Sequence, residues 1–79
     1  MAFIVNDFFM PMRNKVKGLL IDGLGITRYR FWKDTGLSRQ IAYQIADDPS
    51  YIPSGSTIET ICRVYQVQPG DILEFFPDE

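Results

Sequence analysis

The chain has 79 residues, of which 46 % are hydrophobic and 14 % aromatic, and its net charge is −2. A chain this short closes one modest core, which excludes a second catalytic domain, and its apolar content excludes disorder of the whole chain. The single cysteine, Cys62, excludes an internal disulfide and suits a reducing compartment.

The N-terminal segment MAFIVNDFFMPM is apolar but has no basic leader. It carries Asp7 and is interrupted by Pro11, so it is not typical of a signal peptide or a membrane span. We therefore expect a cytoplasmic protein without a membrane-bound part.

Charge is divided unevenly along the chain. Residues 13–46 carry seven basic and two acidic side chains, whereas residues 47–79 carry one basic and seven acidic side chains. The overall charge of −2 argues against nucleic-acid binding, because phosphate neutralisation normally supplies much of the affinity. The asymmetry, however, indicates one basic surface directed at a partner.

Two helices are predicted in the basic half. Apolar residues at helical spacing between Val16 and Leu24, followed by Gly25 as a left-handed stop, predict a first helix over 14–24. Thr27 is a typical N-cap for the next segment, RYRFWKDT, which predicts a second helix. On that helix we expect Phe31, Trp32 and Thr35 to face inward.

A third helix follows a tight turn. Gly36 ends the second helix, and Ser38 can cap the next one. At about 100° per residue, the apolar residues of the third helix gather on one side and its polar residues on the other. The apolar side holds Leu37, Ile41, Ala42 and Ile45, and the free side holds Arg39, Gln40, Tyr43 and Gln44.

The segment DDPSYIPSGS, residues 47–56, is rich in turn-forming residues and predicts a loop. Ser56 and Glu59 have the spacing of a capping box, so we predict a fourth helix that opens at Ser56. Pro69 suits the first position of a short fifth helix, with Asp71 near its positive end.

The apolar segments at the two ends of the chain are short, aromatic and β-prone. We predict that AFIV or FFMPM pairs with ILEFF as a small two-stranded sheet. Such a sheet needs to pack on the helices or to be shared between subunits, because two strands alone are marginally stable.

Two helices joined through a glycine-containing turn, the second with a polar outer face, have the layout of a helix-turn-helix. With one helix before the motif and two after it, the chain resembles the Cro/lambda-repressor type of helix-turn-helix, also called the XRE family. The matching segments are GITRYRFWKDTGLSRQIAYQI and STIETICRVYQVQPGDILEF. The resemblance implies an all-α, five-helix domain over residues 13–79, and we assign residues 1–12 to an N-terminal extension that serves as a strand or dimer arm.

The chain departs from the family at two positions. The family usually has a small residue four positions before the turn glycine and a branched aliphatic residue six positions after it, where this chain has Trp32 and Ala42. We interpret this exchange as a compensated core, in which a large residue and a small one have traded places.

The resemblance implies a sequence-specific transcriptional regulator of a bacterium or a phage, which reads the major groove of double-stranded DNA with its third helix. The residue types suit the recognition of bases, because the Arg side chain matches the acceptors of guanine and the Gln side chain matches the donor and acceptor of adenine. The base-contacting candidates are Arg39, Gln40, Tyr43 and Gln44. The phosphate-contacting candidates are Thr27, Arg28, Arg30, Lys33 and Ser38.

One such helix makes few base contacts, so proteins of this kind usually bind two half-sites as dimers. We expect a homodimer that forms through the C-terminal helix, the terminal strands, or both. The sequence indicates no cofactor and no metal site.

The residues favour DNA binding over two other functions. An enzyme is disfavoured because the chain has no histidine, no cysteine pair, no glycine-rich phosphate loop, and no serine or cysteine beside a suitable base. The alternative is a protein-interaction module on the same scaffold, such as an antitoxin or a regulatory partner subunit, which the acidic C-terminal half would suit. Salt dependence separates this alternative from DNA binding.

Overall fold

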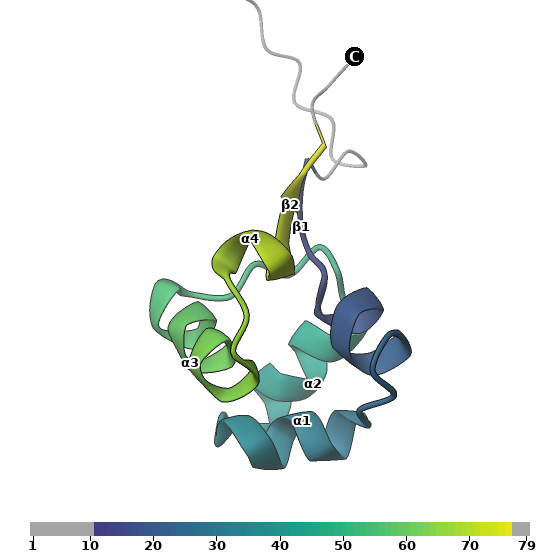
Figure 1. Ribbon diagram of the computed structural model, residues 1–79, viewed down its shortest axis with the longest axis vertical. Coiled ribbons are helices and arrows are strands. Elements are labelled where there is room, and N and C mark those ends of the chain that lie inside the picture. The colour runs from purple at the N-terminus through teal and green to yellow at the C-terminus, as the bar shows by residue number, and fades with distance from the viewer. Residues whose placement is uncertain (1–10, 77–79) are drawn as a thin grey trace, which may run out of the picture.

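The structure is a computed structural model that describes residues 11–76. It is mostly helical, with one small antiparallel sheet, as the sequence predicts (Figure 1). The segment AFIV, one of the two candidates for the N-terminal strand, lies outside the described residues. In chain order the elements are β1 (Met12–Asn14), η1 (Lys17–Asp22), α1 (Arg28–Thr35), α2 (Arg39–Asp47), α3 (Gly55–Tyr65), α4 (Pro69–Ile72) and β2 (Leu73–Phe75).

The core lies where the helices meet. It takes Phe31 from α1, Ile45 from α2 and Ile61 from α3, all of which are fully buried. Leu20 of η1 and Ile72 of α4 close it from the remaining sides. One contiguous apolar cluster therefore fixes α1 and α2 relative to the rest of the molecule.

The prediction of a first helix over 14–24 is wrong in its bounds and its type. The helix is a π-helix, η1, and Leu24 beyond it is 67 % exposed. The helix does not begin at Asn14 because that residue is the last of β1, where its buried amide donates to the carbonyl oxygens of Asp48 (3.0 Å) and Tyr51 (2.7 Å). These bonds hold the loop after α2 against the start of the described chain.

The C-terminal end of η1 is followed by a residue that has to be glycine. A Cβ on Gly23 would lie 2.5 Å from the carbonyl oxygen of Leu19, a distance that real Cβ atoms essentially never show. A glycine directly after the π-helix therefore lets the chain turn toward α1.

The predicted ends of α1 and the start of α2 are confirmed. The Thr27 hydroxyl accepts a hydrogen bond from the Arg30 amide (3.0 Å), and the Ser38 hydroxyl accepts one from the Ile41 amide (3.2 Å). Gly36 has a φ of +71°, in the left-handed region that glycine adopts readily. The two helices of the motif are thus joined by a three-residue turn.

The predicted capping box of the fourth helix is wrong. Helix α3 begins at Gly55, and the hydroxyl that accepts from the backbone, at 3.3 Å from the Thr57 amide, belongs to Ser54. Glu59 instead forms an ion pair with Arg63 at 2.6 Å, one turn further along α3. For α4 the prediction is confirmed, because Pro69 is its first residue and Asp71 accepts from the Gln68 amide at 2.9 Å.

The two ends of the chain pair in a small sheet, as predicted, but the N-terminal strand is not the predicted apolar segment, because β1 shares only Met12 with FFMPM. In the antiparallel sheet Met12 lies opposite Phe75, and Asn14 lies opposite Leu73. Figure 1 shows this ribbon projecting from the helices at the end of the molecule away from α1. Its outer pair, Met12 and Phe75, is exposed.

Candidate nucleic-acid interface

Helix α2 buries one face and exposes the other, as its sequence predicts. Ala42, Ile45 and Ala46 are buried, whereas the side chains of Gln40 and Gln44 are exposed. Within residues 11–76, neither of these glutamine side chains has a hydrogen-bond partner. Both amides are therefore available to donate and accept at once.

Trp32 lies in a different place from the one that the sequence predicts. It is half-buried at the edge of the core, and its ring faces charged side chains. The Lys33 ammonium lies 4.4 Å from the centroid of its ring, and the Arg39 guanidinium carbon lies 5.7 Å from it. Trp32 therefore connects a cation of α1 with a cation of α2.

Two tyrosines extend this arrangement. The rings of Tyr29 and Tyr43 meet that of Trp32 edge-on, at centroid distances of 5.7 Å and 6.4 Å. The Arg39 guanidinium also lies 5.3 Å from the centroid of the Tyr43 ring. The Arg28 guanidinium carbon lies 5.8 Å from the centroid of the same ring. We call these residues the Trp32 cluster; its members are Arg28, Tyr29, Trp32, Lys33, Arg39 and Tyr43.

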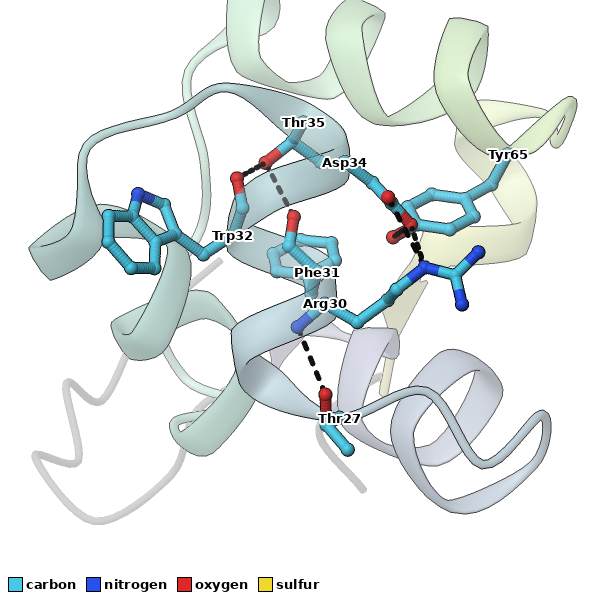
Figure 2. A network of polar contacts seen from close by, with 7 residues as sticks. All are labelled: Thr27, Arg30, Phe31, Trp32, Asp34, Thr35 and Tyr65. Carbon is cyan, nitrogen blue, oxygen red and sulfur yellow. Dashed lines mark hydrogen bonds and ion pairs between the residues drawn. The ribbon is translucent and has the colours of Figure 1, made fainter.

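Arg28 and Arg30 have carboxylate partners within the fold. Arg28 lies 3.1 Å from both carboxylate oxygens of Asp47 on α2, and Arg30 lies 3.1 Å from Asp34 on α1. Figure 2 shows Trp32 on one side of α1, and Asp34 with Arg30 on the other. The structure therefore brings Arg28, Lys33, Arg39 and Tyr43 together and leaves Arg30 apart from them.

Asp34 also ties α1 to α3. The Tyr65 hydroxyl donates a hydrogen bond to its carboxylate at 3.0 Å, as Figure 2 shows. Burial, and then this hydrogen bond, raise the pKa of Tyr65 well above its ordinary value of 10.0. The network thus keeps Tyr65 protonated and occupies Asp34 on the side of α1 away from the Trp32 cluster.

The two remaining phosphate candidates are the capping residues. The oxygens of Thr27 and Ser38 accept from the backbone, so each hydroxyl keeps its proton to donate outward. Both lie at helix N-termini, where the backbone N–H groups and the helix dipole favour an anion.

Three features of this surface were not predicted from the sequence. They are the positions of Tyr29 and Asp47 and the contact of the Trp32 ring with two cations. A signal was present for Tyr29, because Tyr29 and Lys33 are four residues apart and therefore neighbours on a helix surface. Their separation is 5.6 Å from the ammonium to the ring centroid. No comparable signal joins Arg28 to Asp47, because that contact depends on how α1 packs against α2.

The fold and the polar face of α2 define a helix-turn-helix protein. The chain matches the family model of the Cro/C1-type HTH DNA-binding domain over residues 19–78. It belongs to that family, and the predicted resemblance is confirmed, so the protein is a DNA-binding regulator by class. No curated protein and no solved structure matches the chain. No helix within residues 11–76 is long and apolar enough to cross a membrane.

Proposed function

We propose that the protein is a sequence-specific transcriptional regulator that reads the major groove of double-stranded DNA with α2. The observation that carries this proposal is the exposed face of α2, where Arg39, Gln40 and Gln44 have no carboxylate or hydrogen-bond partner within residues 11–76. The groove admits an α-helix, and these residue types complement guanine and adenine edges. Tyr43 would contact a thymine methyl group or a phosphate at the rim of the helix.

Phosphate contacts would position α2 in the groove. Lys33 and the hydroxyls of Thr27 and Ser38 can serve directly. Arg28 and Arg30 would exchange Asp47 and Asp34 for DNA phosphates, and this exchange costs little because both arginine side chains are more than half exposed.

A homodimer would supply the second half-site. The ribbon of β1 and β2 is a suitable interface because Met12 and Phe75, which are 38 % and 60 % exposed, form an apolar pair at its outer end. The ribbon projects from the end of the molecule away from α1, against which α2 packs, so pairing two ribbons would leave the helix-turn-helix free for DNA (Figure 1). We assign residues 13–79 to the DNA-binding domain and residues 1–12 to an extension that contributes to the dimer, in a bacterial or phage protein of the cytoplasm.

The test begins with selection of a binding site from a random duplex pool at near-physiological salt. Arg39→Ala and Gln44→Ala are then each expected to weaken binding to the selected duplex by about 10-fold or more and to relax the preference at one base pair, because each removes a pair of base contacts. Arg63→Ala, which removes an exposed cation from α3, is the control and should leave the base preference unchanged.

A second candidate function is a protein-interaction module on the same scaffold. It is favoured by the ion pair between Arg28 and Asp47, which reduces the positive charge of the Trp32 cluster. In that case binding to a protein partner would persist at high salt, whereas DNA binding through several cations weakens steeply as salt rises. A folded protein that shows no preference among duplexes would contradict the DNA-reading function and support this candidate.

A further inference from the structure

We propose that Trp32 is a positioning residue for DNA recognition, whose indole ring holds Arg39 for a base contact and Lys33 for a phosphate contact. The inference rests on the proposed function and deepens it. It assigns a role in base selection to a residue of α1, outside the polar face of α2.

The ring is approached by a cation from each helix of the motif. Lys33 of α1 lies 4.4 Å from the ring centroid, and Arg39 of α2 lies 5.7 Å from it. A cation within about 6 Å of an aromatic centroid is attracted by the ring quadrupole, most strongly for Trp. One side chain therefore restrains both cations across the turn at Gly36.

The cations near this surface differ in the kind of partner that they have. Arg28 and Arg30 are bound to carboxylates at 3.1 Å, whereas Lys33 and Arg39 form no ion pair within residues 11–76. A carboxylate occupies N–H donors and cancels charge. An aromatic ring restrains the cation while leaving its charge and its outward N–H groups for DNA.

Trp32 is itself held in place. Its ring meets Tyr29 at an interplanar angle of 83° and Tyr43 at 70°, and it packs partly against the core. Arg39, by contrast, is the first residue of α2 and has a long, exposed side chain. A restrained arginine loses less conformational freedom when it binds, so Trp32 should strengthen and sharpen the contact that Arg39 makes.

Direct stacking of a DNA base on Trp32 is less well supported. A stacking platform needs an open ring face, and two cations already lie within 6 Å of the ring centroid. The neighbouring tyrosines are steeply inclined to the ring, so they do not extend it into a flat surface.

The experiment uses the full chain and the duplex enriched from the random pool. Trp32→Leu removes the ring but keeps apolar bulk, and Trp32→Phe keeps a smaller ring; each is made alone and combined with Arg39→Ala. Trp32→Leu should weaken binding by about 10-fold through the loss of two cation–ring contacts and should relax the preference at the base pair that Arg39→Ala affects. Trp32→Phe should restore most of the affinity and the preference.

The combined variants separate positioning from general packing. If Trp32 acts through Arg39, then Trp32→Leu should cost only about 3-fold in the Arg39→Ala background, since only the Lys33 contact remains. Independent multiplication of the two effects would overturn the inference. So would a Trp32→Leu protein that discriminates between bases as well as the unaltered protein does.

Two further measurements keep the result decisive. Circular dichroism checks folding, and if Trp32→Leu does not fold, the same cycle with Trp32→Met, which also lacks a ring, decides, where a coupling below about 2-fold overturns the inference. Trp32 is the only tryptophan, so its fluorescence should change when the selected duplex is added, and less so in Arg39→Ala.

Failure of the unaltered protein to select any duplex would instead overturn the proposed function. That outcome distinguishes failure of the proposed function from failure of the inference about Trp32.

Discussion

Individual polar side chains of this protein fall into two groups. Asn14 and Asp34 are engaged within the fold, where they join the ends of elements that are distant in the sequence. Gln40 and Gln44 are exposed and have no partner within residues 11–76. Polar groups in the interior need partners, whereas exposed ones are hydrated, so the second group stays available for the base contacts that we propose.

Tyr65 offers a test of the first group. Its pKa is raised in the folded state, so the folded protein retains a proton that the unfolded chain releases above about pH 10. The stabilisation from this group is therefore fully present below pH 10 and is lost as pH rises. We expect Tyr65→Phe to lower the free energy of unfolding by about 1 kcal/mol at pH 8, with the difference shrinking above pH 10.

Urea titrations at several pH values measure this difference. Tyr51→Phe is the control, because it removes a tyrosine hydroxyl that makes no bond to Asp34. If the free energy of unfolding of Tyr65→Phe lies below that of the unaltered protein by the same amount from pH 8 to pH 11, the stability does not depend on the proton of Tyr65, and the prediction is contradicted.

At the scale of elements, the helix ends show where local rules suffice. Thr27, Gly36 and Ser38 each act within four residues of their own position, so the sequence alone predicts them correctly. The start of α3 has two candidate serines, Ser54 and Ser56, and the capping-box pattern favours the wrong one. Glu59 completes that pattern in the sequence, but in the fold it binds Arg63.

The two serines form a matched pair for experiment. Ser54→Ala should lower the free energy of unfolding by about 1 kcal/mol, because the Thr57 amide loses its acceptor. Ser56→Ala should change it by less than about 0.5 kcal/mol, since Ser56 is exposed within the first turn. Thermal and urea unfolding would measure both, and equal effects would contradict the assigned cap.

The type and the start of the π-helix η1 could not be predicted from local sequence rules. Its apolar spacing is typical of an α-helix, but its start is displaced by Asn14, which the sheet and the loop after α2 hold in an extended conformation. The requirement at Gly23 appears only with the path of the backbone in three dimensions. Tertiary contacts therefore override the local pattern at this element.

For the whole molecule, the arrangement separates two surfaces. The Trp32 cluster and α2 form one, and the ribbon of β1 and β2 projects from the other end (Figure 1). The polar face of α2 could be predicted from the sequence by periodicity. The cluster could not, because it depends on the packing of α1 against α2, which brings Arg39 and Tyr43 to Trp32.

The ribbon carries the prediction about assembly. Phe75→Glu should convert the proposed homodimer to a monomer, because it places a charge in the apolar pair with Met12. Val64→Glu, which alters an exposed apolar residue of α3, should leave the dimer intact. Sedimentation analysis distinguishes these outcomes, and a Phe75→Glu protein that still sediments as a dimer would exclude the ribbon as the interface.

The central claim is that the exposed face of α2 reads DNA bases. The most direct measurement is selection of duplexes from a random pool by the purified protein at near-physiological salt, with Arg39→Ala selected in parallel. We predict an enriched, two-fold symmetric site whose preference is relaxed at one position per half-site in Arg39→Ala. Recovery of all sequences equally by the folded protein, or the same site selected by both proteins, would contradict the claim.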